Sequence, residues 1–231
     1  MALVVSWDKE VASKFPELAI CAGIIRNVKV ESTNEKIEEL RKQVFEEAKK
    51  KHVLETLKDN PIVRAYRDLF WSLNIDPTKT RPSGEALLRR VLQGKNIPKI
   101  SNVVDAYNLA SLKTIVPLSG FDLEKIFPPL TVRFSNENDI FRGIGMKTPL
   151  KLEKKMPVLA DRKRILCIYP HRDADETKIT NETRNVLIVG YGAPKIGKET
   201  LENAVKTALN LIKRVAGGEI DGIKFYPCTE K

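Results

Sequence analysis

The chain has 231 residues, 42% of them hydrophobic and 30% charged, with 40 Lys and Arg against 30 Asp and Glu. These proportions are those of a globular protein of about one to one and a half domains, and they exclude a fibrous or disordered chain. No apolar run approaches the ~20 residues that cross a bilayer, and the N-terminus lacks the features of a signal peptide. The three cysteines are scattered and have no CxxC spacing, which argues against a disulfide framework and a metal site. We therefore expect a soluble, reduced, cytoplasmic protein with no membrane partner.

One strand followed by helices is predicted for the first third. Residues 18–30 are rich in β-branched side chains, which favour a strand. Thr33 or Asn34 is suited to cap a helix that extends to about residue 59. Acidic and basic side chains are nearly balanced in that helix, which is typical of a solvated surface rather than a binding arm.

A second helix is predicted to begin at Pro61, because proline suits the first helical position. We expect Phe70 and Trp71 in the core rather than in a platform that stacks nucleic-acid bases. A third helix is predicted from Ser83 to the turn at Gly94, a residue that fits the position after a helix end.

Residues 102–113 are apolar almost all round, which predicts a buried helix. Its polar exceptions, Asp105, Asn108 and Ser111, are spaced three apart and so lie on one side of that helix. Buried polar groups must be paired or functional. We expect Asp105 to be structural and to pair with backbone groups of a helix or loop.

Beyond Pro117 the hydrophobic period shortens toward two, which predicts strands. The predicted strands are residues 130–134, 139–145, 164–169, 185–192 and 223–226. An amphipathic helix is expected over residues 198–215. The fold class is therefore α+β in a single domain over residues 1–231, with helices gathered in the first half and a sheet in the second.

Positive charge is concentrated in two segments. Residues 79–99 hold six Lys and Arg against one acid, and residues 142–172 hold nine against two. Such segments are typical of a protein that binds a polyanion, most often nucleic acid, although a lysine-rich solvated surface is the alternative. The expected RNA-binding residues are Arg89, Arg90, Lys154, Lys155, Arg162 and Lys163.

Common catalytic motifs are absent: the sequence has no GxSxG, no P-loop and no HExxH, and nothing indicates a cofactor. The segment from His171 to Thr183 is the densest in polar groups. Within it Arg172 is able to grip a phosphate or carboxylate, with Asp173 holding the arginine in place. A polar loop with capping threonines is the alternative interpretation.

The run from Val104 to Ile126 resembles the B3/B4 domain of the phenylalanyl-tRNA synthetase β subunit. The resemblance is carried by Val104-Asp105, Asn108, Pro117 and Phe121-Asp122, which fall without a gap into the register of that domain's VD–x–x–N and P–x–H–x–FD segments. The flanking sequence is similar to free-standing members of the family. The likeness covers roughly residues 10–215, and the core that bears the motifs is about 77–190.

This resemblance implies an α+β fold with a β-sandwich-like core sheet and flanking helices. It also implies an editing module that binds the 3′ acceptor end of mischarged tRNA and hydrolyses the ester between tyrosine and the phenylalanine tRNA. Two positions depart from the bacterial pattern: Ser119 stands where that pattern has histidine, and Val189 where it has a glutamate that recognises the tyrosine hydroxyl. A trans-editing hydrolase and a non-catalytic RNA-binding or amino-acid-binding module therefore both remain open. An orphan metabolic enzyme is disfavoured because no cofactor motif exists.

The expected site lies where the end of the helix at residues 102–113, the Pro117–Phe121 turn and the His171–Thr183 segment converge. His171 and Asp173 are the candidate catalytic residues, His171 as proton acceptor and Asp173 as the group that orients Arg172 or a water. The candidate substrate-binding residues are Asn108, Pro117, Ser119, Arg172, Thr177 and Thr180. No metal and no cofactor is expected.

Overall fold

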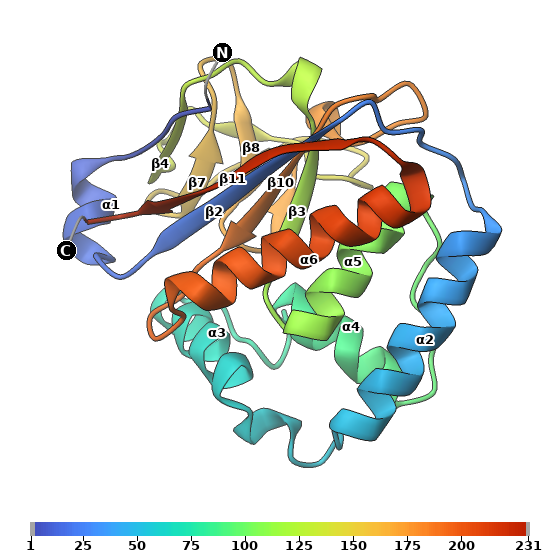
Figure 1. Ribbon diagram of the computed structural model, residues 1–231. Helices are drawn as coiled ribbons and strands as arrows, with labels where there is room; N and C mark the ends of the chain where they lie inside the picture. The colour runs from blue at the N-terminus through green and yellow to red at the C-terminus, as the bar shows by residue number, and fades with distance from the viewer. Residues whose placement is uncertain (1–2, 230–231) are drawn as a thin grey trace.

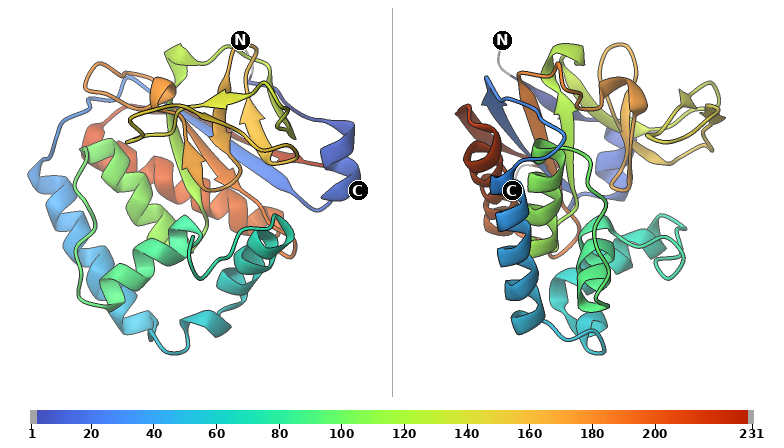
Figure 2. Two further views of the ribbon diagram at one scale, coloured as in Figure 1. Left: turned by 180° about the vertical axis from the view of Figure 1, so that it is seen from behind. Right: turned by 90° about the vertical axis from the view of Figure 1, so that its right-hand side faces the viewer.

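The computed structural model describes residues 3–229 and arranges them in three layers (Figure 1). Helices α5 (Asn102–Thr114) and α6 (Lys198–Ala216) cover one face of a four-stranded sheet. A five-stranded sheet lies on the opposite side of that sheet, as the right-hand view of Figure 2 shows. Helices α2 (Glu35–Lys51), α3 (Pro61–Ser72) and α4 (Ser83–Leu92) extend the helical side below the sheets.

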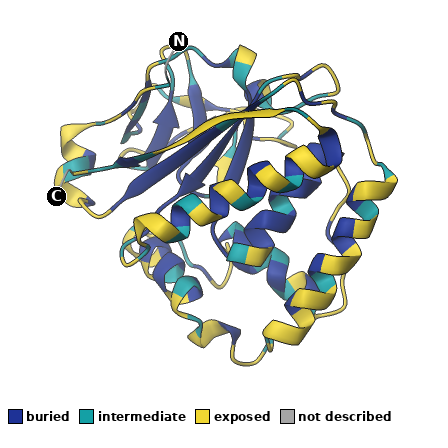
Figure 3. Cartoon of the chain, in the orientation of Figure 1, coloured by how far each residue is buried: buried dark blue, intermediate teal, exposed yellow. Residues whose placement is uncertain are grey.

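The four-stranded sheet is antiparallel throughout, in the order β11-β2-β10-β3. Its strands are β2 (Ala19–Arg26), β3 (Leu118–Asp122), β10 (Val186–Tyr191) and β11 (Glu219–Pro227). Strands β3 and β10 are buried along their whole length, and β2 along nearly all of it (Figure 3). Their uninterrupted apolar sequences fit this position, because strands covered on both faces need no polar alternation.

The five-stranded sheet has the order β1-β4-β7-β8-β9. Its strands are β1 (Val5–Trp7), β4 (Leu130–Phe134), β7 (Pro157–Ala160), β8 (Ile165–Ile168) and β9 (Arg172–Asp173). Strand β1 runs parallel to β4, and the other pairs are antiparallel. A short helix α1 (Lys9–Lys14) follows β1. The hairpin of β5 (Ile140–Phe141) and β6 (Leu150–Lys151) is a separate two-stranded sheet, and its Phe141 packs with apolar residues of β7 and β8. No helix among residues 3–229 combines the length and apolar character needed to span a membrane.

Two glycines let helices approach the four-stranded sheet closely. A Cβ atom at Gly23 would lie 2.7 Å from the Leu209 Cδ1 atom of α6, and one at Gly120 would lie 2.6 Å from the Tyr107 Cε1 atom of α5. Both glycines flank Ile188 of the central strand β10 in the sheet register. A larger side chain in place of either glycine would push the helical layer away from the sheet.

The two sheets are tied together by the buried hydroxyl of Tyr169, which follows β8. That hydroxyl lies 2.6 Å from the carbonyl oxygen of Gly192 and 3.1 Å from that of Ala19, at the ends of β10 and β2. The Tyr66 hydroxyl of α3 donates to the carbonyl oxygen of Tyr191 at 2.7 Å. Because a buried hydroxyl without a partner costs stability, these contacts favour one relative position of the sheets and α3.

The α+β class and the β-sandwich-like core with flanking helices are confirmed. Helices α3, α4, α5 and α6 begin at the predicted residues, and β4 has the predicted bounds. The predicted helix over residues 33–59 is too long, because α2 ends at Lys51. The chain then turns back and buries Leu57 in a short 3₁₀ turn.

Two other expectations are wrong. The sheet is not confined to the second half, since β2 lies between β10 and β11, and the last helix α6 packs on these strands. Trp71 is 56% exposed, whereas its neighbour Phe70 is fully buried. Adjacent residues on a helix point about 100° apart, so only one of the two faces the core. The predicted strand over residues 139–145 is reduced to β5, and β1, β3, β7 and β9 escaped prediction.

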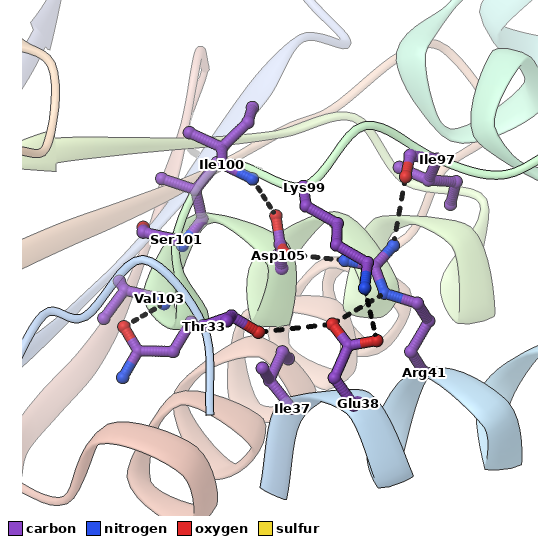
Figure 4. Close-up of polar contacts among 12 residues, drawn as sticks. Thr33, Ile37, Glu38, Arg41, Ile97, Lys99, Ile100, Ser101, Val103 and Asp105 are labelled. Carbon is purple, nitrogen blue, oxygen red and sulfur yellow. Dashed lines mark hydrogen bonds and ion pairs between the residues drawn. The ribbon is translucent and has the colours of Figure 1, made fainter. Parts of the chain in front are cut away.

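Asp105 is structural, as expected, and its surroundings are drawn in Figure 4. Its carboxylate accepts a hydrogen bond from the backbone N–H of Ile100 at 3.0 Å. It also accepts one at 2.6 Å from Arg41 of α2, a buried partner that the sequence did not reveal. Arg41 in turn donates to the carbonyl oxygen of Ile97 at 3.2 Å. This buried pair joins α2 to α5.

Replacing Asp105 by alanine is expected to lower the melting temperature by roughly 6 °C or more. The change removes the hydrogen-bonded carboxylate of the buried Arg41 and leaves it, among residues 3–229, only the longer ion pair with Glu38 at 3.8 Å. Breaking a buried pair typically costs about 3–5 kcal/mol. Lys113→Ala is the matched control, because Lys113 pairs with Glu47 across the same two helices but at the surface. That variant should lose no more than about 1 kcal/mol of stability. Equal shifts in the two thermal denaturation curves would contradict a structural role for the buried pair.

Candidate functional site

Ser119 and Asp173 meet between the two sheets. The Ser119 hydroxyl, on β3, donates to Asp173 Oδ1 at 2.6 Å, although the residues are 54 positions apart in the chain. Along β3 successive side chains point to opposite faces, so Gly120 meets α5 while Ser119 points toward the five-stranded sheet. The structure thus brings together two residues that sequence reasoning placed in the site.

Asp173 lies among groups that are neutral at physiological pH. Cys167 is its direct neighbour across the β8–β9 pair. Burial raises the pKa of the Asp173 carboxyl to about 6, while hydrogen bonds from Ser119 and Cys167 oppose that rise. The hydroxyl of Tyr191 is buried and has no hydrogen-bond partner among residues 3–229. The site therefore holds one acid that titrates close to neutral pH, a property common in catalytic groups.

The two departures from the bacterial pattern lie side by side. Val189 of β10 is the direct partner of Ser119 in the antiparallel pair, so both side chains point to the same face. Val189 is fully buried. The position expected to hold a glutamate is thus filled by an apolar side chain next to the serine.

His171 packs against α3. Its ring packs edge to face against Phe70, with 6.2 Å between the ring centroids. Burial, together with the neighbouring charge of Arg172, lowers the pKa of His171 to about 4. No hydrogen bond among the described residues reaches its buried Nδ1 atom. The imidazole is therefore neutral at pH 7 and is positioned by an aromatic contact.

Arg172 and Asp173 alternate along β9 and so point to opposite sides. The side chain of Arg172 is exposed, and its Cδ atom would lie 2.7 Å from a Cβ atom at Gly143. The glycine thus leaves room for the arginine stem. Within residues 3–229 no ion pair holds the guanidinium, and Asp173 bonds to Ser119 instead of orienting Arg172.

Asn108 and Pro117 do not join the pair directly. Asn108 is half-buried on α5, which packs against the face of β3 opposite to Ser119. Within the described part of the chain its side-chain amide makes no hydrogen bond. The carbonyl oxygen of Pro117 accepts from the backbone N–H of Tyr191 at 3.2 Å. Pro117 therefore contributes to the junction of β3 and β10.

The threonines are divided between packing and turn formation. Thr177 is fully buried, and its hydroxyl lacks a partner among residues 3–229. The backbone N–H of Thr180 donates to Thr183 Oγ1 at 3.0 Å. Thr183 Oγ1 donates to Asp122 Oδ2 at 2.8 Å and so ties this segment to the motif strand β3. Sequence reasoning missed that role, and the equal spacing of the three threonines could not distinguish them.

Three of the nine cations in the larger basic segment form ion pairs. Arg142 pairs with Asp175 at 3.3 Å, Arg164 pairs with Glu176 at 2.6 Å, and Lys154 pairs with Glu137. Lys163 lies over the ring of Phe127, 3.4 Å from its centroid. A cavity of about 670 Å³ on this side is lined by five basic and three acidic side chains, Arg162 and Lys163 among them.

The smaller segment forms a pocket without acids, here called the α4 basic pocket. It encloses about 380 Å³ and is lined by Lys79, Arg81, Ala86, Arg89, Arg90, Gln93 and Lys95. The loop before α4 and the β5–β6 hairpin project from the same side of the molecule in the right-hand view of Figure 2. No set of three or more His, Cys, Asp and Glu side chains among residues 3–229 is suited to hold a metal ion.

Comparison with known proteins places this arrangement in a family. The sequence model of the B3/4 domain matches residues 65–217. The phenylalanine–tRNA ligase β subunit of Fusobacterium nucleatum subsp. nucleatum is 26% identical over 170 residues, which cover 63% of this chain and 21% of that subunit. The β subunit of Francisella tularensis subsp. tularensis is 26% identical over 152 residues, or 56% of this chain and 19% of the subunit. The chain thus spans about one fifth of the length of these relatives.

A solved structure supports the fold. The N-terminal fragment of the phenylalanyl-tRNA synthetase β subunit from Pyrococcus horikoshii superposes with a TM-score of 0.52 and 14% sequence identity, covering 98% of this chain and 55% of that fragment. The family match extends over well more than half of the sequence, from α3 to the end of α6. The chain therefore belongs to the B3/4 domain family and is related to the phenylalanyl-tRNA synthetase β subunit.

Proposed function

We propose that this protein binds tRNA and hydrolyses the ester that links a wrong amino acid to the tRNA acceptor end. The family relationship to a synthetase β subunit supports tRNA as the partner. The observation that carries the catalytic part is the Ser119–Asp173 pair, an acid of raised pKa hydrogen-bonded to a hydroxyl on the motif strand β3. An aminoacyl ester is labile enough that positioning a water and accepting its proton supply much of the required acceleration.

In this mechanism ionised Asp173 is the general base and Ser119 positions the water. The water oxygen attacks the ester carbonyl carbon while Asp173 takes the water proton. The bond from that carbon to the ribose oxygen then breaks, and the proton passes from Asp173 to the departing ribose oxygen. The products are a free amino acid and a tRNA with a free terminal hydroxyl. Arg172, exposed and unpaired within residues 3–229, binds a phosphate near the acceptor end.

A non-catalytic module is the second candidate function. It is favoured by the apolar Val189 beside Ser119 and by the packing of His171 on Phe70, with no hydrogen bond to its buried Nδ1 atom among residues 3–229. A domain that kept tRNA or amino-acid binding and lost the chemistry would have these features. The two candidates differ in one measurable outcome, which is turnover of mischarged tRNA.

Deacylation of a panel of mischarged tRNAs is expected to depend on ionised Asp173. The pKa of about 6 predicts a rate that rises between roughly pH 5 and 7 and then levels off, after subtraction of uncatalysed hydrolysis. Asp173→Asn should lower the rate by about 10²-fold or more and abolish that rise. Asp175→Asn is the matched control, because Asp175 has a lowered pKa through Lys178 and lies two residues away.

His171→Ala should change the rate by only a few-fold, because the imidazole packs on Phe70. A folded His171→Ala protein with a 10²-fold loss would instead make His171 the base. Binding of tRNA without turnover of any mischarged species would favour the non-catalytic module.

Binding of tRNA should weaken steeply with salt, because displaced counterions dominate affinity for a polyanion. Reversing Lys154, Lys155, Arg162 and Lys163 to glutamate is expected to weaken binding to all tRNA sequences in a filter-binding assay and to flatten the dependence on salt. Reversing Lys36, Lys42, Lys49 and Lys50 alters the net charge equally at exposed positions of α2, where acidic and basic side chains are nearly balanced. A comparable loss of tRNA affinity in the two variants would mean that only the net charge matters, and that residues 142–172 do not form a tRNA-binding surface.

A further inference from the structure

Trp71 is the largest side chain that the fold leaves in solvent, with 56% of its surface exposed in the last turn of α3. Large aromatic side chains usually contribute to the core, and an exposed one is informative where it adjoins charged groups. The loop that follows α3 leads directly into the α4 basic pocket and supplies two of its cations, Lys79 and Arg81.

A side chain of α3 near Trp71 reaches α4. Arg67 lies four residues before Trp71, and side chains at this spacing share one face of a helix. Arg67 donates to Glu85 of α4 through two hydrogen bonds of 2.9 and 2.5 Å. Glu85 is also 3.7 Å from Arg89, one of the residues that line the pocket. The indole therefore stands one helical turn from the contact that joins α3 to the pocket wall.

The α4 basic pocket keeps an excess of positive charge. Glu85, 99% buried, is shared by Arg67 and Arg89, so it cannot neutralise both. No carboxylate among residues 3–229 lies within 4.0 Å of the other four cations that line the pocket, Lys79, Arg81, Arg90 and Lys95. Asp76, on the same loop, accepts hydrogen bonds from the backbone and hydroxyl of Thr78. Unpaired cations that converge on one hollow favour a ligand with several phosphates.

We propose that the α4 basic pocket and Trp71 form a subsite for unpaired nucleotides of RNA, with backbone phosphates in the pocket and a base stacked on the indole. Cations that track phosphates beside an exposed aromatic ring are the combination by which proteins bind single-stranded nucleic acid. A phosphorylated small molecule without a base would leave the indole unused. The subsite rests on the proposed function for its choice of RNA as occupant, but it is separate from the Ser119–Asp173 pair.

Fluorescence of Trp71 tests this subsite directly. The chain has two tryptophans, and Trp7→Phe leaves Trp71 as the only one. Titration of that variant with a single-stranded oligouridine should quench and saturate the emission, whereas sodium triphosphate should compete for the pocket without quenching. Trp71→Ala should weaken binding of a labelled oligouridine, measured by anisotropy, by at least about 10-fold. Trp71→Phe should restore most of the affinity, because a phenyl ring still stacks.

The pocket cations are tested in the same assay. Arg81→Ala and Lys95→Ala should each weaken binding and reduce the slope of log affinity against log salt by about 0.7. Lys58→Ala, at an exposed lysine of the 3₁₀ turn before α3, is the control and should change neither quantity.

Unchanged affinity in a folded Trp71→Ala protein, or oligouridine binding without quenching, would overturn the subsite. Quenching by triphosphate equal to that by oligouridine would also overturn it, in favour of a polyphosphate ligand. Failure of the proposed hydrolysis has a different signature, since oligouridine binding would then persist while no mischarged tRNA is deacylated.

Discussion

The hydroxyl of Tyr169 is the contact on which the geometry of the site depends. It lies within hydrogen-bond distance of the carbonyl oxygens of Gly192 and Ala19, so it fixes the end of β8 against the ends of β10 and β2. Its ring packs edge to face on Tyr191, with 5.0 Å between the centroids. Asp173 follows four residues later. The position of one buried tyrosine thus sets where the carboxylate of one sheet meets the serine of the other.

The charge of a sequence segment does not show which of its charged side chains form ion pairs in the folded protein. Summed along the sequence, residues 142–172 are the more basic of the two segments. In the structure three of their nine cations pair with carboxylates, and two of these partners, Asp175 and Glu176, come from just beyond the segment. The α4 segment is less basic in sequence, but five of its cations line one pocket that no acidic side chain lines. Because pairing depends on the fold, a linear sum could identify both segments but could not rank them.

Local signals made much of the fold predictable. Pro61 begins α3, and Gly94 follows the end of α4 with a positive φ. Both residues indicate helix ends through their own backbone conformation, and the two helices lie where they were predicted. Strands β3 and β9 are short and are defined by their pairing with β10 and β8. Their own sequences are too short to show a hydrophobic period, so they were not predicted. For the site, resemblance indicated Ser119 and polar density indicated Asp173. Neither could show that the two share a hydrogen bond across 54 residues.

Helix α3 connects the two candidate sites. Phe70 packs against the ring of His171, the residue two positions before Asp173, and the next residue, Trp71, is exposed one helical turn after Arg67, which bonds to Glu85 of α4. Tyr66 of the same helix donates to the backbone of β10 beside the Tyr169 contact, which fixes α3 on the sheets. In the proposed subsite, RNA anchored at Trp71 would be held by the same helix that packs against His171, just before β9. This arrangement would limit the distance between the end of the bound RNA and the Ser119–Asp173 pair. Ester hydrolysis by a bound water requires that the ester be positioned in this way.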